Sequence, residues 1–269
     1  MSSPVAAALG REEVSEPQFK LLRFNQIKIG EATPYLVKGL IPKCGLTVVW
    51  GPPKCGKWFW TFDLMMHVAL GWDYRGRRVQ QGPVVYLALE GLEGLKGRAE
   101  AFRNKIGDDE VDIPLFVVGP PLNLVQDHVA LIQCIKSQIG MILPGAVVID
   151  TVNRSLLGSE SSDQDMAAYI QAADAVREAF GCAVILIHHC GIDSSRPRGH
   201  TSLTGAADCQ ITVKRDSENN ILATVEFMKD GPEGDQIVSR LQQVDVSPPR
   251  RTKFVKVRCS PEMFALGED

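Results

Sequence analysis

The sequence has no long apolar run, no closely paired cysteines and no excess of positive charge. No apolar stretch reaches the ~18–20 residues needed to cross a membrane, and the beginning of the chain lacks the charged and apolar regions of a secretion signal. The seven cysteines are scattered without a C-x-x-C pair, which argues against a disulfide framework. A net charge of −3 argues against a dedicated duplex-DNA binder. We therefore expect a cytoplasmic protein with no membrane partner.

The length and composition fit one large domain with a short appendage. A chain of 269 residues with 45% hydrophobic side chains has enough apolar surface for a sizeable core. Residues 1–20 are polar and acidic, and we expect them to be disordered. Residues 21–269 are expected to form a single domain. Its last part, from about residue 209, changes to short alternating segments joined by polar turns, which predicts an extension of antiparallel strands.

A glycine-rich loop with two lysines is the clearest motif. It matches the phosphate-binding pattern G-x-x-x-x-G-K-[ST] at every position except the last. In such a loop, backbone N–H groups and a helix N-terminus surround the β-phosphate, and the final lysine reaches the β- and γ-oxygens. We expect ATP or ADP to contact the loop and the start of the helix after it, namely Gly51, Pro52, Pro53, Lys54, Cys55, Gly56, Lys57, Trp58 and Phe59.

Trp58 stands where the pattern needs a hydroxyl that holds Mg²⁺, and indole has no oxygen to offer. Its presence removes one inner-sphere ligand from an octahedral magnesium site. Phosphate contacts through the backbone and Lys57 can survive this loss, but efficient hydrolysis is in question. The alternative is that Trp58 turns away from the metal. Cys55 is expected to be exposed near Lys54 and Lys57, which lower a thiol pKa. The favoured interpretation is a small residue that fits the turn, and the alternative is a modifiable thiol.

Apolar, β-branched segments alternate with helical patterns along the chain. This alternation predicts an α/β fold with a mostly parallel sheet, helices on both faces, and ligands at the carboxyl ends of the strands. The expected parallel strands cover residues 45–51, 82–91, 115–118, 145–151 and 182–189, and the expected helices cover residues 59–70, 94–106, 127–140 and 163–180.

Three polar side chains follow apolar runs at expected strand ends. Asp150 is expected to hold Mg²⁺, the alternative being a cap after the strand. Glu90 is expected to orient and deprotonate an attacking water, unless it only reaches solvent. His188 fits a γ-phosphate sensor, or else is a satisfied buried histidine. His188 and His189 point to opposite faces of a strand, so they cannot easily share a metal ion.

The order of these motifs resembles the RepA-type branch of the RecA-like P-loop ATPases, over about residues 35–230. This branch is related to hexameric replicative helicases and is common on plasmids and phages. The resemblance implies that Glu90 is catalytic, that the histidine pair begins the sensor region, and that subunits form a ring, a hexamer in the related helicases, with nucleotide between them. It also implies a basic residue supplied by the neighbouring subunit. Arg198 and Arg215 are the candidates, and each can equally be an ordinary surface arginine.

The motifs and the resemblance together predict an ATP hydrolase with ATP or ADP and Mg²⁺ as cofactors, in a homo-oligomeric ring that acts on single-stranded DNA in replication. The expected DNA-contacting loop is Gly191–Gly199, which is polar and punctuated by glycine and proline. Two other functions stay open. One is a nucleotide-holding subunit in which Trp58 has abolished turnover. The other is a small-molecule P-loop kinase, which the absence of a lid-like arginine cluster disfavours.

Overall fold

The computed structural model describes residues 21–27, 34–106, 111–191, 197–246 and 254–259. It divides the chain into two compact units, Met1–Ala32 and Thr33–Asp269. The described part of the first unit holds a short 3-10 helix, η1 (Phe24–Gln26). The segment expected to be disordered, residues 1–20, lies outside the described residues, and so do residues 192–196 of the expected DNA-contacting loop. None of the described helices is long and apolar enough to span a membrane.

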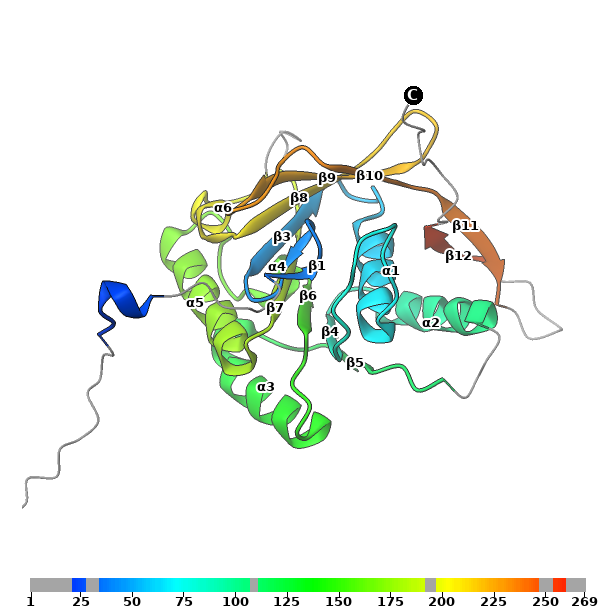
Figure 1. Ribbon diagram of the computed structural model, residues 1–269. Coiled ribbons are helices and arrows are strands. Elements are labelled where there is room, and N and C mark those ends of the chain that lie inside the picture. Colours follow the sequence, from blue (N-terminus) through cyan, green and yellow to red (C-terminus); the bar gives the residue numbers. More distant parts are fainter. Residues whose placement is uncertain (1–20, 28–33, 107–110, 192–196, 247–253, 260–269) are drawn as a thin grey trace, which may run out of the picture. The chain divides into compact units, whose positions relative to one another are not determined.

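An eight-stranded sheet forms the centre of the second unit (Figure 1), with the strand order β10-β9-β8-β3-β7-β6-β4-β5. The strands from β8 to β5 are parallel, and β9 and β10 are antiparallel. The strand bounds are β3 (Leu46–Gly51), β4 (Val84–Ala88), β5 (Leu115–Val118), β6 (Ala146–Asp150), β7 (Ala183–His189), β8 (Cys209–Arg215), β9 (Ile221–Met228) and β10 (Gln236–Ser239).

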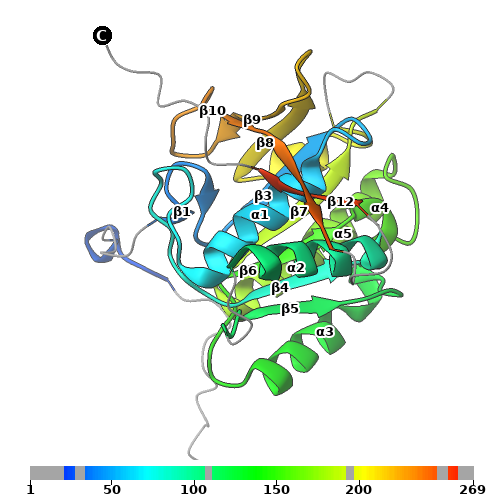
Figure 2. The same ribbon diagram turned by 90° about the vertical axis from the view of Figure 1, so that its right-hand side faces the viewer.

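Helices cover both faces of this sheet (Figures 1 and 2). The first pair, α1 (Lys57–Leu70) and α2 (Leu92–Ile106), covers one face, and the second pair, α3 (Leu124–Ile139) and α5 (Asp163–Phe180), covers the other. Every residue of β3, β4 and β6 is buried, because strands covered on both sides are apolar throughout instead of alternating. The expected α/β class, with a mostly parallel sheet and antiparallel strands near the C-terminus, is confirmed.

The parallel part of the sheet extends one strand further than expected. The segment that begins at Cys209 was expected to be antiparallel, but β8 runs parallel to β3. A parallel neighbour needs a crossover connection, and the chain between β7 and β8 provides one that includes α6 (Ser202–Ala206). The antiparallel part therefore begins at β9, whose register with β8 joins Cys209 to Met228 and Arg215 to Ile221.

Two small antiparallel pairs flank the main sheet. The first joins β1 (Tyr35–Val37) to β2 (Ile41–Pro42) shortly before β3 begins. The second joins β11 (Leu241–Asp245) to β12 (Phe254–Cys259). The backbone of β12 lies beside α1 and α2. The remaining short helix, α4 (Val152–Ser155), follows directly after β6.

Asp208 connects the start of β8 to the start of β3. Its Oδ2 accepts a hydrogen bond of 2.9 Å from the backbone N–H of Leu46, and its Oδ1 lies 3.4 Å from Nζ of Lys229. A Cβ on Gly45 would lie 3.0 Å from the same carboxylate. This carboxylate therefore fixes how the central strand enters the sheet, and with it the position of the loop at the strand's far end.

Replacement of Asp208 by Ala is expected to lower the free energy of unfolding by about 1.5–3 kcal/mol, because the change leaves a strand N–H without its charged acceptor. Urea denaturation measures this change. Glu226→Ala, an exposed position on β9, is the matched control and is expected to stay within about 0.5 kcal/mol of the wild type. Equal midpoints for the two variants would contradict this role of Asp208.

Candidate functional site

The loop between β3 and α1 is closely packed against the last strands of the sheet. A Cβ on Gly51 would overlap the carbonyl oxygen of Val213 in β8. Gly56 precedes α1 with a φ of 105°, a left-handed conformation that favours glycine, and a Cβ there would overlap Ile221 in β9. Both glycines of the motif are thus required by their neighbours, and they place the N-terminus of α1 at the carboxyl end of β3.

Lys57 folds back onto this loop. Its side chain is almost entirely buried, with 5% of the residue exposed. Nζ donates hydrogen bonds of 2.8 Å to the carbonyl oxygens of Gly51 and Pro52. Burial lowers the pKa of Lys57, and the nearby Cys55 partly offsets this effect. The ammonium group is therefore held at the centre of the loop by acceptors that it would leave when it reached a phosphate.

The expected exposure of Cys55 was wrong, whereas the interpretation of Cys55 as a small residue that fits the turn agrees with the structure. The residue is 4% exposed and packs inside the loop. Burial raises the pKa of the Cys55 thiol, and the positive charge of Lys57 only partly opposes the rise. The thiol lies 3.8 Å from Nζ of Lys57. Cys55 is thus the small residue that fits the turn rather than an exposed, reactive thiol.

A cavity of 330 Å³ opens in front of the loop. It joins the carboxyl ends of β3, β4, β6 and β7, the edge at which a parallel sheet presents ligand-binding residues. The structure therefore brings together the expected Lys57, Glu90 and Asp150, although 33 residues or more separate each from the next in sequence. The lining residues are Lys54, Gly56, Lys57, Trp58, Phe59, Glu90, Gly91, Asp150, Thr151, Ile187 and His189.

Asp150 ends β6 at the floor of the cavity and is 4% exposed. Its Oδ2 accepts a hydrogen bond of 3.0 Å from the hydroxyl of Tyr86 in β4. Burial raises the pKa of Asp150 to about 7, because it disfavours the charged carboxylate; the negative charge of Glu90 adds to the rise, and Tyr86, Arg98 and Lys57 oppose it. Asp150 is thus a strongly desolvated carboxylate that already has a hydrogen-bond donor.

Glu90 lies at the mouth of the same cavity, two residues after β4 ends. Its side chain is 48% exposed. The hydroxyl of Thr151 donates a hydrogen bond of 3.4 Å to Oε2 of Glu90, and Nε of Arg154 lies 3.9 Å from the same oxygen. Two residues that follow the Asp150 strand therefore orient this carboxylate and leave it accessible to solvent.

The two histidines at the end of β7 face opposite ways. His189 lines the cavity, and burial together with the charge of Lys57 lowers its pKa. His188 is fully buried on the other face, and its Nε2 donates a hydrogen bond of 2.7 Å to the carbonyl oxygen of Arg198. Burial lowers the pKa of His188. The structure therefore presents His189 to the cavity and uses His188 to hold the backbone at Arg198.

Both candidate arginines have partners within the chain. Nε of Arg198 lies 3.1 Å from Oε2 of the buried Glu160, and the arginine side chain is 60% exposed. Nε of Arg215 donates a hydrogen bond of 3.3 Å to the carbonyl oxygen of Lys54, and its Nη1 donates one of 2.5 Å to Oδ1 of Asn219. Arg215 thus braces the glycine loop of its own subunit, whereas Arg198 lies on the connection after β7.

Trp58 packs between α1 and α2. Its ring is covered by the guanidinium of Arg98, which also lies 4.2 Å from the centre of the Phe59 ring. A Cβ on Gly94 would lie 3.1 Å from the indole, so this glycine leaves room for the large side chain. The indole at the expected hydroxyl position is therefore accommodated by specific neighbours and carries a cation on its face.

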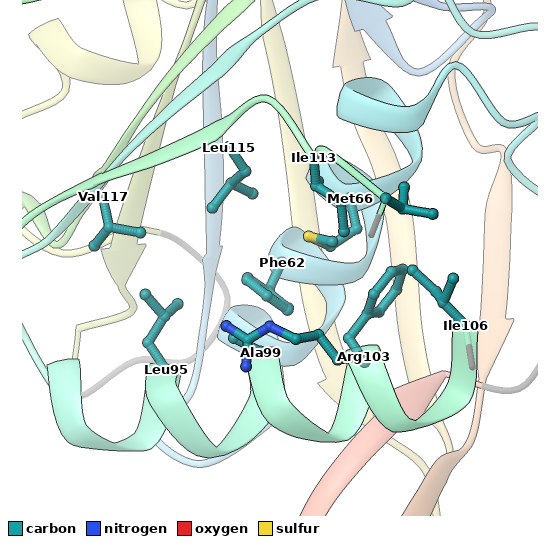
Figure 3. A pocket seen from close by; sticks show the side chains of 11 residues that line it. Phe62, Met66, Leu95, Ala99, Arg103, Ile106, Ile113, Leu115 and Val117 are labelled. Atoms are coloured by element: carbon teal, nitrogen blue, oxygen red, sulfur yellow. The ribbon is translucent and has the colours of Figure 1, made fainter. Parts of the chain in front are cut away.

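A second cavity of 240 Å³ lies between α1, α2 and β5. Figure 3 shows Phe62, Leu95 and Leu115 directed into it from these three elements. Its lining is apolar apart from Arg103, which pairs with Glu100 on the same helix. Nothing in this lining resembles the charged loop of the first cavity.

Four residues of the first site carried no recognisable sequence signal. Arg98 is one of several basic residues on a helix, and Tyr86 is one apolar-looking position in a buried strand. Thr151 and Arg154 follow Asp150 and contact Glu90 only because β4 and β6 are neighbours. The contacts of Thr151 and Arg154 with Glu90 depend on strand order, which cannot be read from the sequence.

Comparison with known proteins agrees with this geometry. The model of the AAA domain family AAA_25 matches residues 13–195, and the chain belongs to this family. It is a RecA-like P-loop ATPase by fold and motif. A similar solved structure is the KaiC-like protein PH0186 from the hyperthermophilic archaeon Pyrococcus horikoshii OT3, with a TM-score of 0.55 and 14% sequence identity over 77% of this chain and 90% of that chain. At this identity the likeness shows the fold alone. No protein of curated function matches the sequence.

P-loop ATPases generally bind nucleotide together with Mg²⁺. The nucleotide phosphates fit this site, whereas the magnesium ion does not. The glycine loop, the N-terminus of α1 and Lys57 provide the donors that phosphates need. The residues present do not fit Mg²⁺. Trp58 supplies no oxygen where the family pattern has one, and Oδ2 of the desolvated Asp150 carboxylate already accepts a hydrogen bond from Tyr86. Magnesium tolerates little departure from octahedral oxygen coordination.

Replacement of Lys57 by Ala is expected to weaken ADP binding by about tenfold or more, or 1.4 kcal/mol, because the loop loses its central cation. Titration calorimetry measures this change. Lys136→Ala removes an exposed lysine from α3, on the opposite face of the sheet, and is expected to bind ADP as the wild type does. Equal affinities for wild type and Lys57→Ala, with both proteins folded, would remove this loop from the binding site.

Proposed function

We propose that the chain binds ATP or ADP on the loop 51–57 and acts as a RepA-type ATPase. One observation carries this proposal: a single cavity gathers Lys57, Glu90 and Asp150 beside a glycine loop that leads into a helix. The family supports an ATPase, and the RepA-type assignment rests on the order of motifs along the chain. Backbone N–H groups of the loop hold the phosphates, and Lys57 turns from the loop carbonyls towards them.

In this proposal Glu90 is the general base. It is the carboxylate of the cavity that is both accessible to solvent and held in place, by Thr151 and Arg154. A base of this kind takes a proton from the water that attacks the γ-phosphate. His189, which lines the cavity, takes the role of γ-phosphate sensor in this proposal instead of His188, for which the sequence predicted it. His188 does not contact the nucleotide in this proposal. Its hydrogen bond to the carbonyl oxygen of Arg198 positions the segment that carries this arginine.

Replacement of Glu90 by Gln is expected to lower the rate of ATP hydrolysis by at least ~100-fold, the scale of general-base loss, while nucleotide affinity stays the same. A steady-state phosphate-release assay measures the rate. Glu93→Gln is the matched control, since Glu93 lies in the first turn of α2, is exposed and pairs with Lys96. Unchanged turnover in Glu90→Gln would assign the base to another residue.

We propose that the subunits form a ring because the chain resembles the RepA-type branch. Arg198 is the better candidate for a residue that reaches a neighbouring subunit, because its side chain is largely exposed and a buried carboxylate orients it. Arg215 already contacts its own glycine loop. We propose that single-stranded DNA contacts the ring through Gly191–Gly199, which contains Arg198, and that the ring serves the replication of a mobile element.

If a subunit completes its neighbour's site, ATPase activity per chain is expected to rise steeply with protein concentration. Mixing Arg198→Ala chains with wild-type chains is expected to lower activity by more than simple dilution, whereas mixing with Arg103→Ala chains, changed at an exposed arginine of α2, is expected to leave the activity per chain unchanged. Analytical ultracentrifugation under nucleotide measures the assembly directly. A monomer at tens of micromolar protein would reject the ring.

A second function is favoured by one observation, the replacement of the metal-binding hydroxyl by Trp58. In this alternative the chain holds nucleotide and controls assembly without turnover. An ATPase assay with and without single-stranded DNA separates the possibilities. Turnover stimulated by DNA supports the RepA-type ATPase, and binding without turnover supports the holding subunit. ATP consumption that needs a small-molecule phosphoryl acceptor would indicate a kinase instead.

A further inference from the structure

Arg98 is a buried cation between α2 and α1 that takes no part in the function described so far. Arg98 comes from α2 and is 7% exposed. Its Nε and Nη1 are buried and have no hydrogen-bond partner among the residues that the structure describes. A buried guanidinium without such partners is costly. Some compensating interaction must therefore hold Arg98 in this place.

The aromatic rings of α1 provide part of that compensation. The Arg98 guanidinium covers the ring of Trp58 and lies 4.2 Å from the centre of the Phe59 ring. Cations are attracted to the faces of aromatic rings, most strongly to tryptophan. Both rings also line the nucleotide cavity. Arg98 is thus attached to the wall of the phosphate site through the residue that replaces the metal-binding hydroxyl.

Asp150 is the second group that acts on Arg98. Burial lowers the pKa of Arg98 to about 9, and Tyr86 and Asp150 oppose this effect. Arg98 in turn opposes the rise that burial causes in the pKa of Asp150. In the family pattern, a magnesium ion would lie between an aspartate at this position and the phosphates. Here a cation of the protein lies against Trp58, which lines the cavity. Guanidinium is weakly hydrated and suited to buried pairs with carboxylates and phosphates.

We infer that Arg98, held on the Trp58 ring, supplies the positive charge that Mg²⁺ supplies elsewhere in the family, so that the chain binds nucleotide phosphates without a metal ion. This inference rests on the proposed nucleotide site. Trp58 is then a working part of the site, because it anchors the cation that takes over the charge of the metal. The role inferred for Arg98 is in nucleotide binding, and no step of hydrolysis is assigned to it.

The test is calorimetric titration of the full chain with ADP and with adenylyl imidodiphosphate, once in excess EDTA and once in Mg²⁺. The wild type is expected to give dissociation constants within about threefold of each other in the two conditions. Affinity that is about tenfold or more stronger in Mg²⁺ would overturn the inference and leave the nucleotide site intact. Absence of binding in both conditions would overturn the proposed function as well.

Two variants test whether Arg98 and Trp58 are responsible for metal-free binding. Arg98→Gln is expected to bind about tenfold or more weakly in EDTA, whereas Arg103→Gln, an exposed position on the same helix, is expected to bind as the wild type does. Trp58→Ser restores the missing hydroxyl and releases Arg98, so its binding is expected to become dependent on Mg²⁺. Wild-type affinity of folded Arg98→Gln in EDTA would overturn the role of Arg98. Thermal melting confirms folding, and the wild-type comparison stands without either variant.

Discussion

The position of the central strand is the constraint on which the site depends. β3 lies between β7 and β8, and all of its residues are buried. Its end must pass so close to β8 that only glycine fits at position 51. The same packing leaves no room for a side chain at position 56, where the backbone turns into α1. Sheet packing, rather than the loop sequence alone, therefore sets the geometry of the phosphate loop.

Two cations lie in or beside the cavity, and in the proposed account they take over the charge of the metal ion. Lys57 is held by the loop carbonyls on one side, and Arg98 is held by aromatic rings on the other. The buried Asp150 carboxylate feels both cations. Glu90 differs because it is accessible and hydrogen-bonded. One carboxylate is thus suited to balancing charge within the site and the other to exchanging protons with water.

Much of the fold could be predicted because strands buried on both sides are apolar throughout and end in polar residues. The positions of Glu90 and Asp150 at strand ends followed from this pattern, and loop 51–57 followed from its glycine and lysine motif. The direction of β8 did not, because it depends on a crossover between β7 and β8 that has no periodic signal. The burial of Cys55 and of His188 depends on how the loop and the end of β7 pack in the folded chain, which no sequence pattern records. Arg98 was missed for the same reason, since it meets Trp58 only when α1 and α2 pack together.

A crystal structure of the chain with bound ADP tests the central claim most directly. The account predicts that the β-phosphate lies within the loop 51–57 and that Nζ of Lys57 has left the carbonyl oxygens of Gly51 and Pro52 to contact it. ADP bound elsewhere would contradict the account. So would ADP in the cavity with Lys57 still on those carbonyls and no contact between the loop and a phosphate.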